Sequence, residues 1–150
     1  MAKFTFRLET VLRVREQEEM ERRKELMEEE TLLREIQQRV IDLEGENRKI
    51  EDSLRGHQGQ GGSAQELASH IAYLHALKGR MVEAQDGVMR QQNITERKRR
   101  EVAEAQKNKK MIENLREKSY REWREEREEL ERKDLDEIAM LRHSRNRDKQ

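Results

Sequence analysis

The sequence predicts an all-α protein in which two long helices form an antiparallel coiled-coil hairpin with a glycine-rich turn. Two apolar heptad runs lie on either side of a glycine cluster, and each run indicates a long helix. The composition agrees, because 44% of the residues are charged, 3% are aromatic and none is proline. So few apolar residues cannot fill a globular core, while the sustained apolar stripe distinguishes the chain from a disordered tail.

The two heptad runs mirror each other across the glycine cluster. The first run consists of Leu26, Leu33, Val40, Asn47 and Leu54, and the second of Leu67, Leu74, Met81, Val88 and Thr95. Folding the chain back at the cluster pairs Leu54 with Leu67, Val40 with Met81 and Leu33 with Val88. In the same register, the second seam places Ile50 opposite Ile71, Leu43 near Leu77 and Ile36 near Ala84. A mirror register kept over four heptads predicts antiparallel pairing.

Residues 1–150 are therefore interpreted as a single hairpin. The first helix is expected over about residues 5–55, the turn over about 56–62 and the second helix over about 64–142. The turn segment GHQGQGGSA holds four of the seven glycines, each of which costs a helix interior about 1 kcal/mol relative to alanine. Ser63 followed by Glu66 has the spacing of a capping box, which predicts where the second helix begins.

The second helix is expected to be longer than the first, about 118 Å against about 75 Å at 1.5 Å per residue. Residues after about Ser119 would then have no partner within the chain. Apolar side chains continue along this overhang, which indicates a docking surface or an oligomer contact. They are Tyr120, Trp123, Leu130, Leu135, Ile138, Met140 and Leu141.

The predicted seam becomes polar toward the open end of the hairpin. Its positions between residues 15 and 29 are Arg15, Glu19, Arg22 and Glu29, with Gln92, Lys98 and Val102 opposite them. This pattern predicts a hairpin that is firm near the turn and loose near the termini. Asn47 is a single polar residue within the firm part, where it either fixes the register or faces solvent.

No catalytic constellation is found, and we expect neither enzymatic activity nor a cofactor or metal site. The GQGGS segment lacks the ending of a phosphate-binding loop, and the four histidines do not have metal-ligand spacing. Without cysteine there is no disulfide framework. No signal peptide and no membrane-spanning segment are apparent, so we expect no direct membrane insertion.

Charge is balanced overall, with 33 basic and 33 acidic residues, but it is segregated locally. Residues 97–118 contain nine basic and four acidic residues, and residues 119–137 contain five basic and nine acidic ones. A basic helix can bind phosphates. We favour a surface complementary to an acidic protein partner, because acidic residues adjoin the basic stretch and no parallel zipper follows it.

The ends of the chain resemble the FliJ family, the small stalk proteins of the flagellar type III export apparatus. The opening FTFRLETVLRVREQEE is similar to the start of that family, and ENLREKSYREWREEREELERKDLDEIAMLR is similar to its C-terminal stretch, above all at Lys133 to Ala139. The resemblance implies an antiparallel hairpin, shaped like the γ stalk of rotary ATPases. It also implies a non-enzymatic cytoplasmic protein, held peripherally at the inner membrane through its partners.

Those partners would be the hexameric export ATPase, the cytoplasmic domain of the export-gate membrane protein and the export chaperones. By the resemblance, the ATPase-binding residues would be Phe4, Phe6, Leu8, Leu12, Arg13, Arg15, Leu135, Asp136, Glu137 and Ile138. The gate-binding residues would be Leu43, Ile50, Tyr73 and Leu77. Only Tyr73 of these four is aromatic, although the family patch is often richer in aromatics, and the three aliphatic residues also belong to the predicted seam.

Two other functions remain as alternatives. The chain could be a generic coiled-coil scaffold that dimerises through its overhang, or a basic-helix nucleic-acid binder. A scaffold gives no reason for the particular FTFRLE start and LDEIA end, so the export-stalk interpretation is preferred.

The seam generates a prediction about stability. Leu33→Ala or Val40→Ala should lower the free energy of unfolding by about 1–3 kcal/mol, toward the low end because a two-helix seam is only partly buried. Substitutions between Arg15 and Arg22 should leave thermal melting almost unchanged. Chemical denaturation followed by circular dichroism measures both effects, and equal losses in the two regions would contradict the firm-and-loose interpretation.

Overall fold

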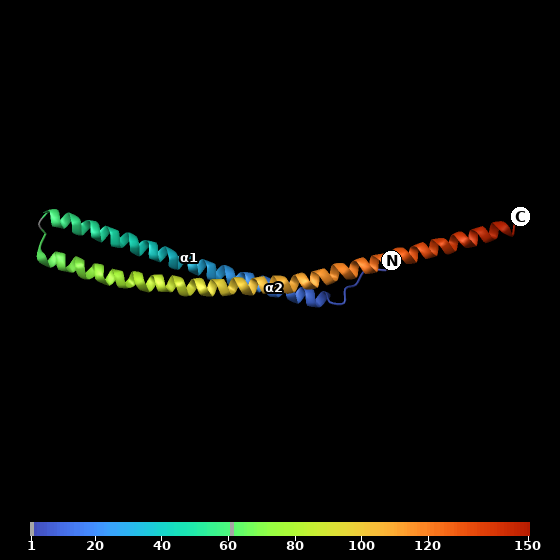
Figure 1. The fold of residues 1–150 in the computed structure, drawn as a ribbon, viewed down its shortest axis with the longest axis horizontal. Coiled ribbons are helices and arrows are strands. Elements are labelled where there is room, and N and C mark those ends of the chain that lie inside the picture. Colours follow the sequence, from blue (N-terminus) through green and yellow to red (C-terminus); the bar gives the residue numbers. More distant parts are fainter. Residues whose placement is uncertain (1, 61) are drawn as a thin grey trace. The chain divides into compact units, whose positions relative to one another are not determined.

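The computed structural model describes residues 2–60 and 62–150, and in them it contains two long helices, α1 (Glu9–Gln60) and α2 (Ala64–Arg147) (Figure 1). The chain divides into two compact units. Unit 1 combines Met1–Glu19 with Ala105–Gln150, and unit 2 is Met20–Glu104. Both helices contribute to each unit, so the prediction of an all-α fold with two long helices packed against each other is confirmed.

In unit 2 the two helices run antiparallel. Contacts descend along α1 as they ascend along α2: Glu46 meets Tyr73, Ile36 meets Gly87, Glu29 meets Gln91 and Glu25 meets Lys98. The antiparallel pairing inferred from the mirrored heptads is therefore confirmed. A Cβ added at Gly87 would lie 3.9 Å from Ile36 Cγ2, an ordinary packing distance.

The seam of unit 2 has one fully buried large side chain among the described residues, Leu77, which is 1% exposed. Its predicted neighbour Leu43 is also buried. The predicted pairs Leu54–Leu67, Val40–Met81 and Leu33–Val88 all consist of half-buried residues. The seam is thus a single layer, since two helices alone cannot enclose a core on all sides.

Near the start of α2, one predicted seam residue is wrong. Ile71, expected opposite Ile50, is 55% exposed, whereas the preceding residue His70 is half-buried. The second seam of α2 repeats every seven residues at His70, Leu77, Ala84 and Gln91, which are all half-buried or buried. Ile71 stands one position off this repeat, and one residue turns a helix by about 100°, so its side chain points away from the seam.

Polar residues are part of the seam in unit 2. Gln91, rather than the predicted Gln92, is buried, and its Nε2 donates to the backbone oxygen of Glu29 at 3.2 Å and to the Glu29 carboxylate. Lys98 Nζ lies 3.2 Å from Glu25 and 3.3 Å from Glu101. Both ion pairs raise the pKa of Lys98, and Lys98 and Arg22 lower the pKa of Glu25. The polar stretch is consequently bonded across the helices.

The single asparagine of the seam does not link the two helices through its amide nitrogen. Asn47 is half-buried, and its Nδ2 donates to Glu51 Oε1 of the same helix at 3.2 Å. Its Oδ1 is buried without a hydrogen-bond partner among the described residues. This geometry supports neither a register-fixing bond across the seam nor a fully solvent-facing side chain.

The open end of the hairpin, in unit 1, has a core of its own. Phe6, Leu12 and Ala105 are buried. Glu19 is buried too, and it forms an ion pair with Lys109. The expectation of a loose polar end is therefore corrected, because Glu19 is paired and the apolar Phe6 and Leu12 lie on the N-terminal side of it. Substitution of Glu19 should accordingly lower stability, unlike the other substitutions between Arg15 and Arg22.

The ends of the helices differ from the predicted bounds. α1 begins at Glu9 rather than near residue 5, and it continues to Gln60, past the predicted end near 55. It passes through Gly56, where an added Cβ would meet nothing within 4 Å, so one glycine lowers helix stability without preventing the helix. Of the predicted turn, Gly61 lies outside the described residues.

The predicted cap of the second helix is present. Glu66 N donates to Ser63 Oγ at 3.2 Å, and α2 follows from Ala64. Ser63 thus satisfies one of the backbone donors that a helix start leaves unpaired. At its other end α2 continues to Arg147, past the predicted residue 142, and its last turn carries Arg145 and Arg147, whose positive charge is favourable at a helix C-terminus.

The polar seam generates a stability prediction at Thr95. This residue is 1% exposed, and its hydroxyl has no hydrogen-bond partner among the described residues. Because burying an unpaired hydroxyl is costly, Thr95→Val should raise the free energy of unfolding by about 1 kcal/mol. Urea denaturation measures the change, with Thr31→Val as the matched control.

Thr31 is exposed, and its hydroxyl donates to Met27 O at 2.9 Å, so the control substitution should bring no gain. A loss of stability in Thr95→Val would mean that the buried hydroxyl is satisfied in solution, for example by an ordered water.

Candidate protein-interaction site

Unit 1 contains a non-helical N-terminal segment, here called the strap, which comprises residues 2–8. Residues 2–6 have no regular secondary structure, and a turn at residues 7–8 leads into α1. Glu9 N donates to Phe6 O at 3.2 Å, and Leu12 N donates to Leu8 O at 2.9 Å. The strap is held by its side chains, since Phe6 is buried and Phe4 is half-buried.

Phe4 forms a three-ring cluster with two residues of α2. Its ring centroid lies 5.2 Å from Tyr120 in an edge-to-face arrangement and 5.8 Å from Trp123. Tyr120 and Trp123, one helical turn apart, are stacked at 5.9 Å. These are favourable geometries for aromatic pairs, each worth about 0.5–1.5 kcal/mol beyond the area that it buries. We call Phe4, Tyr120 and Trp123 the aromatic platform.

Two arginines of α2 flank the platform. Arg116 Cζ lies 6.0 Å from the centroid of Phe4, while its Nε lies 3.2 Å from Glu9 Oε2 at the start of α1. Arg127 Cζ lies 5.9 Å from the centroid of Trp123. A guanidinium over a ring face is attracted by the ring quadrupole. Arg116 therefore ties both the strap and the first residue of α1 to α2.

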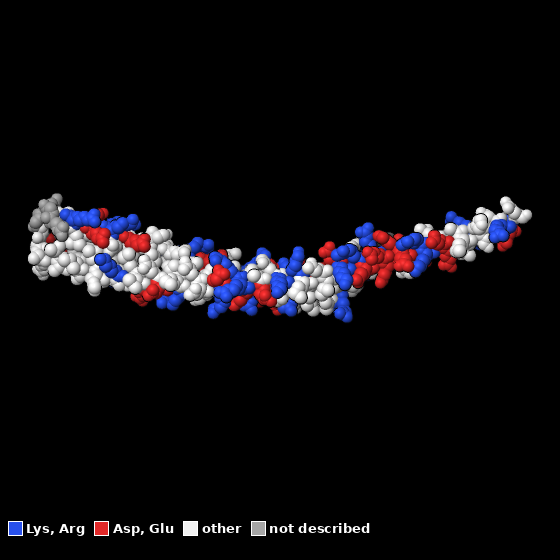
Figure 2. Space-filling view, in the orientation of Figure 1, with Lys and Arg blue, Asp and Glu red and all other residues white. Residues whose placement is uncertain are grey.

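The rest of α2 in unit 1 is open to solvent. Every residue from Glu131 to Gln150 is exposed. The charged side chains pair along the helix, as in Arg124–Glu128 at 3.0 Å and Lys133–Glu129 at 2.9 Å. Lys133 lowers the pKa of Glu129 by donating a hydrogen bond to its carboxylate. Figure 2 shows Asp and Glu side chains gathered on this stretch of α2.

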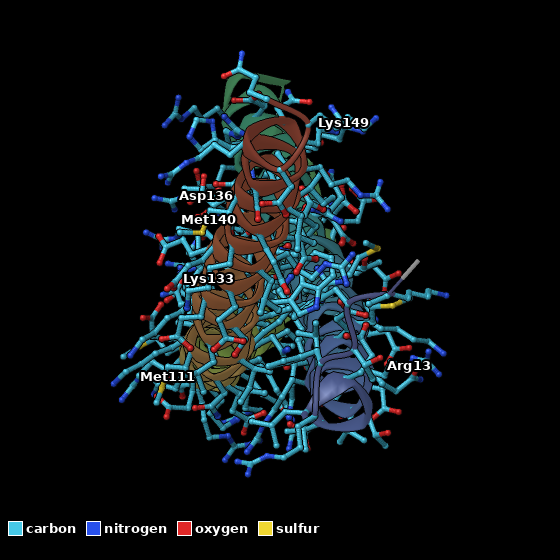
Figure 3. All side chains as sticks on the ribbon, turned by 90° about the vertical axis from the view of Figure 1, so that its right-hand side faces the viewer. Arg13, Met111, Lys133, Asp136, Met140 and Lys149 are labelled. Carbon is cyan, nitrogen blue, oxygen red and sulfur yellow. The ribbon has the colours of Figure 1, made fainter. Side chains whose placement is uncertain are left out.

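The structure divides the predicted ATPase-binding residues into two groups. Phe6 and Leu12 are buried, Phe4, Leu8 and Arg15 are half-buried, and Arg13 is exposed on α1 (Figure 3). The second group, Leu135, Asp136, Glu137 and Ile138, is exposed on α2. Trp123 and Leu135 are twelve residues apart, about 18 Å along a helix, so the strap and this second group lie at two different positions along α2.

The predicted gate-binding residues lie in unit 2. Leu43 and Leu77 are buried in the seam, and Ile50 is half-buried. Tyr73 is the one exposed member of the four, and its hydroxyl donates to Glu46 of α1. This hydrogen bond to the carboxylate raises the pKa of Tyr73, because it favours the protonated phenol. A partner can reach Tyr73 directly but not Leu77.

Sequence reasoning missed the aromatic platform, since it left Tyr120 and Trp123 without an intramolecular partner. The strap explains the error. An extended residue advances about 3.3 Å, against 1.5 Å in a helix, so a non-helical start reaches further along α2. Glu9 contacts Arg116 and Phe4 contacts Trp123. The five positions from Glu9 back to Phe4 therefore span the same length as seven positions of α2. The alternation of Phe4 and Phe6 before the first heptad was the available signal.

No group of three His, Asp or Glu residues within 2–56 and 62–150 is placed to hold a metal ion. In the same part of the chain no helix is long and apolar enough to cross a membrane. Two long helices that pack along one seam define a coiled-coil protein.

Comparison with known proteins gives the family. The model of the flagellar FliJ protein family matches residues 4–148, and the chain therefore belongs to the FliJ family. It is accordingly a non-enzymatic component of the flagellar export apparatus.

Among solved structures, the chain is similar to a YscO homologue, CT670, from Chlamydia trachomatis. The two are 21% identical, with a TM-score of 0.58 over 99% of this chain and 100% of the other, and this likeness concerns the fold. No curated protein matches the chain.

The platform generates a spectroscopic prediction. Phe4→Ala removes the ring that contacts both Tyr120 and Trp123. Because Trp123 is the chain's one tryptophan, its fluorescence reports on this site. We expect its emission to move to longer wavelength and acrylamide to quench it more strongly, while far-UV circular dichroism stays unchanged.

Phe4→Leu serves as the matched variant for this measurement. It keeps an apolar contact without the ring geometry, so its spectrum should lie between those of the wild type and Phe4→Ala. Identical spectra for all three proteins would mean that the strap is not docked on α2 in solution.

Proposed function

We propose that the chain is the stalk of the export apparatus and that it binds the hexameric export ATPase through unit 1. The observation that carries this proposal is the uncovered stretch of α2 beyond the aromatic platform. Leu135, Ile138 and Leu141 are exposed there, on a part of α2 against which the described residues place no second helix. Apolar side chains that stay exposed on a charged helix are typical of a surface that a partner covers.

The predicted ATPase-binding residues have different parts in this proposal. Arg13, Leu135, Asp136, Glu137 and Ile138 are accessible, so they can contact the ATPase directly. The buried residues Phe6 and Leu12 cannot be reached in the folded chain, and they act by holding the strap and α1 against α2. Phe4, Leu8 and Arg15 are half-buried and can do both.

For the export gate, we propose that its cytoplasmic domain binds unit 2 at Tyr73, with a contribution from the half-buried Ile50. Leu43 and Leu77 then belong to the packing that supports this surface. We also propose that the chain assists the cycling of export chaperones. It would work in the cytoplasm, attached to the inner membrane through its partners, as the family resemblance implies.

Nucleic acid is not among the partners that we propose. Several residues of the basic stretch 97–118 are already paired with carboxylates of α1: Lys98 with Glu25, Arg99 with Glu30, Lys109 with Glu19 and Arg116 with Glu9. Such pairing leaves fewer cations to neutralise phosphates. Duplex binding that weakens steeply with salt would contradict this proposal.

Truncation after Arg132 tests the proposed contact with the ATPase. The deletion removes Leu135, Ile138 and Leu141, and every residue that it removes is exposed, so the remaining fold should be unaffected. The full chain should stimulate the cognate export ATPase and hydrolyse no ATP itself. The truncated chain should lose this stimulation while its helicity per residue stays nearly unchanged.

Steady-state phosphate release and circular dichroism measure the two quantities. Retained stimulation by the truncated chain would show that the contact lies elsewhere. Absence of stimulation by the full chain would contradict the stalk function itself.

A further inference from the structure

The strap builds an aromatic surface instead of covering one. With Phe4 in place, Tyr120 is still 44% exposed, and Phe4 and Trp123 are only half-buried. A segment that served as a cover would bury the rings. Aromatic residues and arginine are enriched in the centres of protein interfaces, and the platform carries Arg116 and Arg127 at its edges.

The helix–helix seam of unit 1 continues past this platform along α2. Leu130 follows Trp123 by two turns, Ile138 follows after two further turns, and Leu141 comes one turn later. Leu130, Ile138 and Leu141 are 57%, 46% and 61% exposed. We call Trp123, Leu130, Ile138 and Leu141 the open stripe. It is open because α1 begins only at Glu9 and does not reach this part of α2.

The ion pairs of this stretch leave the open stripe clear. At 3.6 residues per turn, Arg124–Glu128 and Lys133–Glu129 lie on other faces of α2, and Arg121–Glu117 and Lys118–Glu122 do as well. The charged side chains therefore bond to each other around the sides of the helix. The apolar line between them stays free for contact.

We propose that the aromatic platform and the open stripe together bind one amphipathic helix of a protein partner. This helix packs on the part of α2 that lies beyond the first residue of α1, in line with the seam. This inference rests on the proposed function, from which the export ATPase is the partner to test. The contact is one-sided, so the opposite face of α2, around Arg132, stays in solvent. Phe4 is a positioning residue that fixes the first layer of the new seam.

A helix fits the spacing of the stripe, because residues at whole-turn intervals present one line to a second helix. Charge argues against a second copy of this chain. Residues 119–137 contain nine acidic and five basic residues, so two such stretches side by side would repel each other. The complementary partner is an amphipathic helix with basic residues on both sides of its apolar face.

Cysteine scanning can map this contact, because the chain has no native cysteine. Single cysteines are placed on the stripe at Leu130, Ile138 and Leu141, and off the stripe at Arg132 and Met140. Met140 is 74% exposed and extends from α2 in Figure 3, which makes it the matched apolar control. The rate of alkylation by N-ethylmaleimide is measured for each variant with and without the purified cognate ATPase.

We expect the ATPase to slow alkylation by at least about tenfold at the stripe and by less than about twofold at Arg132 and Met140. Adding Phe4→Ala should weaken the protection at Leu130 more than Phe4→Leu does. Equal protection on all faces would mean that the partner encloses α2, which overturns the inference and leaves the proposed function standing.

Other outcomes separate the two proposals further. ATPase binding without protection of the stripe overturns the inference alone, whereas absence of ATPase binding overturns the proposed function and the inference that rests on it. A dimer of the chain by itself, detected by sedimentation equilibrium and dispersed by Leu130→Glu but not by Met140→Glu, would assign the stripe to a second copy and overturn the choice of partner.

Discussion

The packing of α1 against α2 along a single seam is the interaction on which the rest of the structure depends. Isolated helices in water are marginally stable, and the described part of the chain holds no sheet or third helix to cover α1 and α2. With 44% charged residues, the chain can bury apolar side chains in this one line only. Leu77 in unit 2 and Phe6 and Leu12 in unit 1 are buried because the two helices meet there.

Polar side chains within the seam limit how stable it is. In unit 2, Gln91 is bonded to Glu29, while the hydroxyl of Thr95 is buried without a partner among the described residues. In unit 1, Glu19 is buried against Lys109. A buried ion pair often contributes little net stability, although removing one partner is costly. These layers therefore define which residues face each other more than they add to the free energy of unfolding.

The fold could be predicted because heptad spacing constrains helices over many turns, and because Ser63 and Glu66 mark a helix start locally. Errors arose where one residue or one backbone conformation decides the outcome. Ile71 lies one position off the seven-residue repeat of His70, Leu77 and Ala84, and the extended strap brought Phe4 to Trp123. The candidate site was predictable only as a region. The exposure of each side chain decides which residues a partner can reach, and the heptad pattern of α2 does not show where an irregular strap will dock.

A seam of this kind also restricts where a partner can bind. Within the paired parts of the chain the buried apolar side chains face the other helix, and the outer faces carry charged residues among which apolar side chains such as Ile41 and Val82 are exposed. Apolar surface in line with the seam remains accessible where α2 extends past the first residue of α1. This extension exists because α1 has 52 residues and α2 has 84. Phe4 and Trp123 lie at that point in unit 1. The unequal helix lengths are therefore the structural feature on which the proposed interaction rests.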